Sequence, residues 1–183
     1  MKIRIVLLFL LIFGSCNPDP ESVDVKIDVT NRDLVLKNGV LFYKDNPFNG
    51  QITERDDVNG TNNISNYING LKEGVEFKHY DTNQLAESRN YHKGKKIGLH
   101  EGFFDNGQKK FSYQYESGVY HGSFRQWYAS GQLLKEFNYV HGKEVGSQMM
   151  WNFDGTIRAN YVVKNGERFG LIGLKKCYSV QKK

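Results

Sequence analysis

The stretch YESGVYHG at residues 115–122 decides the fold, because the chain repeats its pattern at a fixed interval. The segments YINGLKEG at 67–74, YHKGKKIG at 91–98 and YVHGKEVG at 139–146 place one aromatic residue and two glycines at the same positions. Each copy begins 24 residues after the previous one, with no insertion. Self-similarity at a fixed period of this length is typical of a repeat architecture.

Four columns of residues define the repeat. The first column holds Gly50, Gly74, Gly98, Gly122, Gly146 and Gly170. Four residues before it stand Gly70, Gly94, Gly118, Gly142 and Gly166, with Asn46 in the earliest copy. Seven residues before it stand Tyr43, Tyr67, Tyr91, Tyr115 and Tyr139, with Val163 in the last copy. Nine residues after it come Gly107, Gly131 and Gly155, with Asn59 and Asn83 in the first two copies.

Each unit contains two runs in which apolar and polar residues alternate. In KKFSYQYESG (109–118) the rings Phe111, Tyr113 and Tyr115 alternate with polar side chains, and TIRANYVV (156–163) has the same period. A period of two indicates a strand with one apolar face. Short segments such as DNG, ASG and ESG separate the runs, and glycine takes a positive φ there at little steric cost. The repeated unit is therefore predicted to be a β-hairpin.

These patterns predict an all-β fold, an elongated, twisted and curled antiparallel sheet of tandem 24-residue β-hairpins. A lone hairpin is marginally stable in water, so each copy must pair with its neighbours to bury its aromatic face. We expect the tyrosine column to run through successive hairpins, each ring stacking near the next. The composition agrees, because 19 Gly beside 11 Tyr and 12 Phe, with only 3 Pro, favours strands joined by turns over disorder.

Residues 115–146 resemble the MORN-repeat variant of bacteria. Their sequence is YESGVYHGSFRQWYASGQLLKEFNYVHGKEVG. The matching features are an aromatic-x-x-Gly-x-x-x-Gly step and an aromatic-x-x-Gly turn, here Phe104 to Gly107 and Tyr128 to Gly131. The resemblance runs from about Asn38 to Gly170. It implies a MORN-like solenoid that makes contacts with proteins or lipids. Bacterial members are often labelled as antitoxin components, by association more than by mechanism.

The N-terminal residues 1–15 have the pattern of an export signal. Two cations precede nine unbroken apolar residues, Ile5 to Phe13, a run too short to remain as a membrane-spanning helix. The following FGSC resembles the lipobox of bacterial lipoproteins, with Phe13 where the family usually has Leu. This resemblance implies that Cys16 becomes the N-terminus and carries lipid. The alternative is an ordinary secretory signal cut nearby, which leaves a soluble protein.

The lipobox also implies a cellular address and a domain plan. By resemblance to sorted lipoproteins, Asn17 in place of Asp after the cysteine favours the outer membrane over the inner one. Several acyl chains hold a protein on its membrane, because each buried methylene contributes about 0.8 kcal/mol. We expect residues 16–36 to form the lipidated cysteine and an extended tether, 37–170 the repeats, and 171–183 a capping strand and tail.

Charge and cysteine content restrict the partners. The net charge falls from +5 to +3 when Lys2 and Arg4 leave with residues 1–15. The remaining charges form no basic stripe, so nucleic acid is not an expected partner. If Cys16 carries lipid, Cys177 has no cysteine partner within the chain. A Cys16 to Cys177 disulfide is the alternative, and it requires that the lipobox interpretation be wrong.

Few residues suggest chemistry. Among five histidines, His79, His92, His100, His121 and His141, the last two occupy nearly equivalent turn positions, yet no further ligand stands at a recognisable spacing. We therefore predict no metal site. Cys177 beside two lysines is either a reactive thiol or a small apolar residue of the cap. The sequence has no recognisable catalytic pair, triad or phosphate loop, so neither an enzyme nor a cofactor is expected.

Large side chains gather in the central units. Because they fall on both alternating faces of a single-layer sheet, we expect some to line an exposed groove for a peptide, glycan or acyl chain. The candidates are Phe124, Trp127, Tyr128, Met149 and Trp151, with Met150 beside them. The alternative is that they fill the core. The expected function is that of a monomeric, non-catalytic envelope lipoprotein that binds another protein. Alternatives are an antitoxin or immunity protein for a toxin, and a metal carrier or enzyme.

Overall fold

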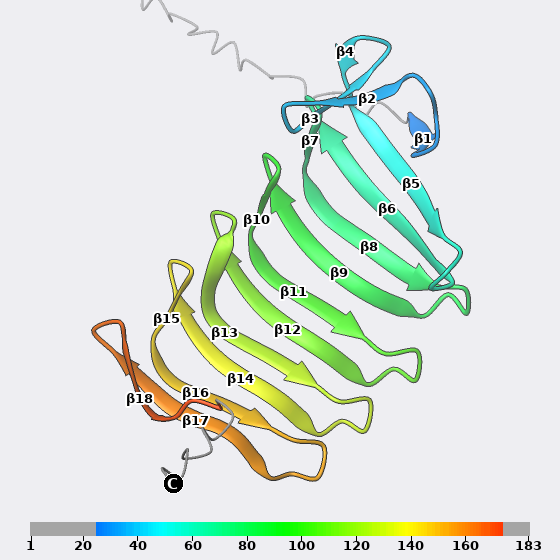
Figure 1. The fold of residues 1–183 in the computed structure, drawn as a ribbon. Coiled ribbons are helices and arrows are strands. Elements are labelled where there is room, and N and C mark those ends of the chain that lie inside the picture. Colours follow the sequence, from blue (N-terminus) through cyan, green and yellow to red (C-terminus); the bar gives the residue numbers. More distant parts are fainter. Residues whose placement is uncertain (1–24, 174–183) are drawn as a thin grey trace, which may run out of the picture.

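The computed structural model describes residues 25–173, which form eighteen β-strands and no helix. Figure 1 shows most of these strands side by side in one long row, each of them curved. Within the described range, no helix is long and apolar enough to cross a membrane. The predictions for the signal peptide, Cys16 and Cys177 fall outside these residues.

The main sheet has fifteen strands, and twelve of them form one continuous path. In spatial order these are β1 (Lys26–Asp28), β5 (Gly50–Asp56), β6 (Thr61–Ile68), β8 (Gly74–Tyr80), β9 (Leu85–His92), β11 (Gly98–Phe103), β12 (Lys109–Glu116), β13 (Val119–Trp127), β14 (Leu133–Val140), β16 (Gly146–Trp151), β17 (Ile157–Lys164) and β18 (Glu167–Leu171). Three short strands, β7 (Leu71–Lys72), β10 (Lys95–Lys96) and β15 (Lys143–Glu144), pair with β6, β9 and β14. Neighbours on the path are antiparallel except β1 and β5, which are parallel. The predicted all-β sheet of tandem hairpins is confirmed.

The register of the sheet repeats with the sequence. Glycines of the first column lie directly opposite the tyrosine column, in the pairs Gly50↔Tyr67, Gly74↔Tyr91, Gly98↔Tyr115 and Gly122↔Tyr139. The last copy keeps this register with Val163 opposite Gly146. The period of 24 residues therefore fixes which residues face each other across every hairpin.

The second glycine column lies in tight turns between strands. In the turn at His141 and Gly142, φ is positive at both residues, 47° and 78°, which is the geometry of a type I′ turn. The same geometry recurs at positions 69–70, 93–94, 117–118 and 165–166. The glycine N–H also donates to a carbonyl of the preceding hairpin, as Gly142 does to Tyr120 at 2.8 Å. Gly70, Gly94 and Gly118 make the same bond, so these four turns are each fixed to the preceding part of the chain.

The face that carries the tyrosine column, called here the tyrosine face, is the buried one. Tyr91 in β9 and Tyr115 in β12 are only 8% and 9% exposed, although Figure 1 shows a single layer of strands at β9 and β12. A single-layer sheet buries side chains only where it curves around them. Rings from neighbouring strands lie between successive tyrosines: the His100 ring is 5.7 Å from Tyr91 and 4.5 Å from Tyr115. The tyrosines therefore do not stack directly on one another, because a ring from the strand between them, such as His100, separates successive tyrosines.

Polar side chains hold the strands apart where they split near the I′ turns. The Gln148 amide accepts from Asn138 N at 3.1 Å and donates to Asn138 O at 3.0 Å, and it is fully buried. His100 Nε2 lies 3.2 Å from Asn90 N and 2.9 Å from Asn90 O, so this one ring nitrogen accepts from the N–H or donates to the carbonyl, depending on the tautomer. The Asn138 side chain donates to Ser147 O at 2.7 Å. The Gln148 contacts replace the ladder hydrogen bonds that the split removes at Asn138, so both backbone groups of that residue remain satisfied, while His100 satisfies one of the two at Asn90.

The N-terminal end differs from the predicted domain plan. β2 (Leu34–Lys37), β3 (Val40–Tyr43) and β4 (Asn46–Pro47) form a separate three-stranded sheet, so Tyr43 is outside the row of repeats. It packs instead against the buried Phe48, in a small core with Ile27 and Ile52. β1 lies inside the segment expected to be a tether, so the predicted boundary at residue 36 is wrong. The folded part already includes Val25, whose carbonyl accepts from Gln51 N at 2.8 Å.

The C-terminal prediction is tested only in part. The last described strand, β18, ends at Leu171, where the capping strand was expected to begin. Its residues are all exposed, and residues 174–183 lie outside the described part of the chain.

Candidate binding surface

The structure separates the five residues predicted to line a groove. Phe124 is 7% exposed and stacks on Tyr113 within the tyrosine face, with ring centroids 4.1 Å apart. Met150 packs against the same core, so its neighbour Met149 lies on the other face of the strand. Trp127, Tyr128 and Trp151 come together at one edge of the sheet, where the Tyr128 hydroxyl donates to Trp151 O at 3.1 Å.

We define the aromatic edge as six aromatic residues at the ends of the hairpins away from the I′ turns. The loops at these ends lie at the lower right of Figure 1. The members of the aromatic edge are Phe103, Phe104, Trp127, Tyr128, Trp151 and Phe153. A register shift directly precedes Phe103, Trp127 and Trp151 in β11, β13 and β16. Such bulges bend a strand and redirect the next side chain. The edge is therefore a product of the repeat, since these three residues are 24 positions apart.

Neighbouring units are joined along this edge. The hydrogen bond from the Tyr128 hydroxyl to Trp151 O has an equivalent two repeats earlier in the chain, where the Tyr80 hydroxyl donates to Phe103 O at 2.9 Å. Phe153 packs edge-to-face on Tyr128 at 5.4 Å and remains 67% exposed. Trp127 and Trp151 are half-buried. Rings that are held in place and still partly exposed are suited to contact another molecule.

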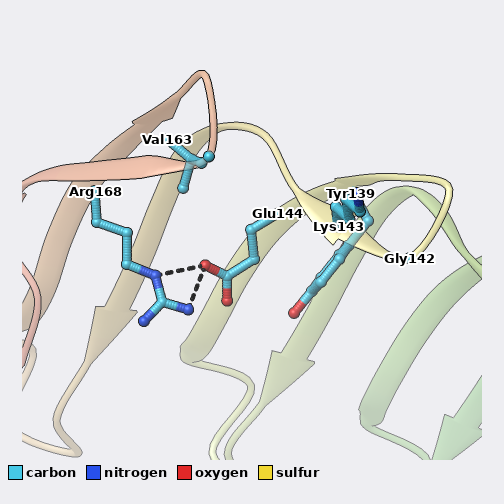
Figure 2. Close-up of a pocket in the computed structure, with 7 residues that line it drawn as sticks. Tyr139, Gly142, Lys143, Glu144, Val163 and Arg168 are labelled. Atoms are coloured by element: carbon cyan, nitrogen blue, oxygen red, sulfur yellow. Dashed lines mark hydrogen bonds and ion pairs between the residues drawn. The ribbon is translucent and has the colours of Figure 1, made fainter.

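A shallow hollow opens on the tyrosine face near its C-terminal end. It has a volume of about 380 Å³ and is lined by Tyr139, Gly142, Lys143, Glu144, Val163, Gly166 and Arg168. Figure 2 shows Tyr139, Glu144 and Arg168 pointing to the same side of the ribbon. Glu144 Oε2 accepts from Arg168 Nε at 3.1 Å and Nη2 at 3.0 Å, and from the Tyr161 hydroxyl at 3.0 Å. The carboxylate is therefore already occupied by internal donors.

Burial raises the pKa values of two tyrosines beside this hollow. It raises the pKa of Tyr139 to about 12, with the nearby Glu144 charge as the second cause. The pKa of Tyr161 rises to about 12 for the same reason, with its hydrogen bond to Glu144 adding to burial. A phenol is protonated near neutral pH already at its ordinary pKa, and the Tyr161 hydroxyl donates to Glu144.

A buried carboxylate lies in the N-terminal half of the tyrosine face. Glu76 is 7% exposed, accepts from Ser65 Oγ at 2.6 Å and pairs with Lys72. Burial would raise the pKa of Glu76, but the hydrogen bonds from Lys72 and Ser65 outweigh it and lower the pKa. This ion pair, like that of Glu144, is satisfied from within the sheet.

One cluster was missed by the sequence analysis. Glu116 lies beside both His121 and His141, with one ligand atom of each within 4.8 Å of the others. The spacing of the two histidines suggested their approach, but Glu116 stands 25 residues before His141 and belongs to the preceding turn. Only the lateral stacking of the hairpins brings it near. The sequence contains a signal for this approach. Glu116 stands one period before Val140, the neighbour of His141, so stacking of successive hairpins places Glu116 near His141.

Comparison with known proteins leaves the family open. No family model matches the chain, and no curated protein matches it significantly. The resemblance to the MORN-repeat variant therefore remains an expectation from the residues themselves. The function has to be argued from the surfaces described above.

Proposed function

We propose that the protein is a non-catalytic, lipid-anchored protein of the bacterial cell envelope whose repeat sheet binds another protein. The aromatic edge is its principal contact surface in this proposal. The lipid anchor rests on the pattern of residues 1–16, and the outer membrane is favoured by Asn17. The binding role rests on one structural observation, the row of partly exposed rings that crosses successive repeats.

The chemistry of this row supports a protein partner. Tryptophan and tyrosine are enriched among the residues that contribute most to protein interfaces, because they bury large areas with little loss of side-chain freedom. Trp127, Tyr128 and Trp151 are half-buried, so much of each ring is already fixed before a partner arrives. Preorganised rings lose less conformational entropy on binding. Phe153, 67% exposed, is the most exposed residue of the row.

Cations near the edge extend its range of contacts. Lys109 Nζ lies 5.9 Å from the ring centre of Phe103, and Lys110 Nζ lies 5.6 Å from that of Phe104. Lys109 Nζ also donates to Glu101 Oε1 at 2.7 Å. Lys110 is therefore the basic group that this edge offers beside an apolar ring, a combination that suits a partner segment with both aromatic and acidic residues.

Two carboxylates that are paired within the sheet support a non-catalytic role. Glu76 is paired with Lys72, and Glu144 with Arg168. General bases and nucleophiles need a lone pair directed at a substrate. Both carboxylates instead direct theirs at donors of the same chain, as groups that hold a fold together do.

Affinity capture of the intact, lipidated protein from crosslinked membranes tests the proposal. Trp127→Ala and Phe153→Ser remove rings of the aromatic edge, and Val58→Ser is the matched control, because Val58 is a 94% exposed apolar residue elsewhere on the chain. We expect the control to capture the same partner as the parent. Each edge variant should retain about one tenth or less, the loss that corresponds to a contact of about 1.4 kcal/mol.

Unchanged circular dichroism would show that the edge variants are folded. Equal capture by all four proteins would refute the aromatic edge as the contact surface. Recovery of Cys16→Ser in the membrane fraction at the level of the parent would separately refute the lipid anchor.

A further inference from the structure

Three metal-ligating side chains meet at the edge of the sheet formed by the I′ turns. Glu116 ends β12, His121 lies in β13, and His141 lies in the turn after β14. Glu116 Oε2 is 2.9 Å from His121 Nδ1 and 3.6 Å from His141 Nδ1. The two imidazole ring centres are 5.0 Å apart.

The repeat holds these residues on well-defined backbone. Glu116 pairs with Val119 across the turn that joins β12 to β13, which places His121 on the same hairpin. His141 occupies the first central position of the next I′ turn, with φ of 47°. That turn is fixed to β13 by the hydrogen bond from Gly142 N to Tyr120 O, 2.8 Å long. The ligands therefore come from two adjacent hairpins whose relative position is set by the sheet.

The spacing of the three groups suits a small coordination sphere. Zinc bonds to imidazole nitrogen and carboxylate oxygen are about 2.0 to 2.2 Å long, so neighbouring ligand atoms in a tetrahedral site lie about 3.3 Å apart. The distances of 2.9 and 3.6 Å from the Glu116 oxygen lie on either side of that value. The ligand atoms of the two histidines lie within 4.8 Å of each other, so the two imidazole side chains must rotate toward each other to share one ion.

The exposure of the cluster allows a metal to enter. The side chains of Glu116, His121 and His141 are 55%, 38% and 73% exposed. Two imidazoles and one carboxylate favour borderline divalent ions such as Zn²⁺, Ni²⁺ and Cu²⁺ over the oxygen-preferring Ca²⁺ and Mg²⁺. Three protein ligands leave at least one coordination position for water or for a group of another molecule.

We propose that Glu116, His121 and His141 form a binding site for a divalent transition-metal ion that bridges two successive hairpins. This inference goes beyond the protein-binding function proposed above and does not depend on it. A metal held by both hairpins links Glu116 and His121 to the following turn, so it stabilises the stacking of adjacent repeats at this edge.

The chain contains a matched control for an ordinary ion pair. His92 Nδ1 lies 2.8 Å from Glu73 Oε1, at the same edge of the sheet, in a pair between adjacent hairpins with only one imidazole. If carboxylate and imidazole alone sufficed, this pair would bind metal as well. The proposal requires the second imidazole, so His92→Ala should leave metal binding unchanged.

Calorimetric titration of Zn²⁺ into the mature, detergent-solubilised chain tests the site, with Ca²⁺ as the ionic control. We expect one equivalent of Zn²⁺ and no Ca²⁺ to bind. His121→Ala and His141→Ala should each lower the Zn²⁺ affinity at least about tenfold, since even the loss of a group that only orients a ligand costs that much. Zn²⁺ should raise the thermal unfolding midpoint of the parent and of His92→Ala, and should not raise that of His121→Ala.

Either of two results would overturn the proposal. One is the absence of saturable Zn²⁺ binding by the parent. The other is equal affinity in the parent, His121→Ala and His141→Ala, which would place the ion elsewhere on the chain. Substituting Co²⁺ identifies such another site, because a thiolate-to-cobalt absorption band would assign it to Cys177.

Discussion

Truncation of Tyr115 to alanine should destabilise the sheet by about 3 kcal/mol. The ring is 9% exposed and lies between His100 at 4.5 Å and Tyr120 at 4.7 Å, with Lys96 Nζ 5.2 Å from its centre. Removing a large aromatic side chain from a closed core costs about 3 to 5 kcal/mol. The value at Tyr115 should fall at the lower end, because the single-layer sheet lets water fill part of the space left behind.

Urea unfolding followed by circular dichroism measures this loss. Tyr115→Phe is the matched control, because it keeps the ring and removes only the hydroxyl, at a cost of about 1 kcal/mol. The parent and both variants should unfold with similar denaturant slopes, so that the midpoints report stability. A free energy of unfolding for Tyr115→Ala within about 0.5 kcal/mol of the parent value would place the ring in solvent and refute its role between hairpins.

Two further predictions concern single positions. Burial lowers the pKa of His100 below its ordinary value of 6.5. The unfolded chain therefore binds the proton of His100 more tightly than the folded protein does. The contribution of neutral His100 to stability should be fully present above pH 6.5 and should be lost as the pH falls below that value. His100→Gln, which copies the arrangement of Gln148, should lose less stability between pH 7.5 and pH 5 in urea unfolding; equal losses would contradict the assignment. Gly118→Ala should lower stability by about 1 to 2 kcal/mol in thermal unfolding, because φ is 92° there while the nearest atom to an added Cβ, on Lys95, is 3.9 Å away; an unchanged midpoint would show that the turn adapts.

The repeat period predicted what depends on local backbone geometry. Two-residue turns with glycine second, such as Asn69-Gly70, specify type I′ geometry and hence the hairpin. Once the turn is fixed, the pairing of Gly98 with Tyr115 follows from the register. The fold class could therefore be inferred from the sequence without a relative of known structure.

The period alone did not predict which side chains contact each other between neighbouring repeats. Sequence gave the tyrosine column but not the rings between its members, because these depend on how strongly the sheet curves. The insertion of His100 and Gln148 between split strands was missed, although Asn90 and Asn138, their backbone partners, stand at twice the repeat distance. That asparagine column was present in the sequence and could have been read.

The N-terminal departure has a local cause. Tyr43 fits the tyrosine column, but Val40–Tyr43 follows the turn at Asn38 and Gly39, where φ is positive at both residues. This turn pairs β3 with β2, which lies directly before it in the chain. A short local hairpin closes at a smaller entropic cost than pairing with a more distant strand. The local pairing prevails over the repeat here.

The predicted groove stays a prediction. Trp127 and Trp151 lie at equivalent ends of successive hairpins because they are one period of 24 residues apart, and Tyr128 follows Trp127 directly. Phe124 and Met149 do not join them, since strand alternation sends Phe124 to the tyrosine face and Met149 to the opposite one. The bulges that separate these groups leave no simple mark in the residue pattern.

Deletion of residues 99–122 tests the central claim most directly. The segment is 24 residues long, so its removal joins Gly98 to Ser123, the residue equivalent to Leu99, and preserves the register of every remaining hairpin. If the protein is a row of interchangeable stacked hairpins, the shortened chain should retain the β-sheet circular dichroism spectrum and unfold cooperatively on heating. Removal of 99–110 alone breaks the register and should abolish both. An unfolded 99–122 deletion, or equal behaviour of the two deletions, would contradict the account.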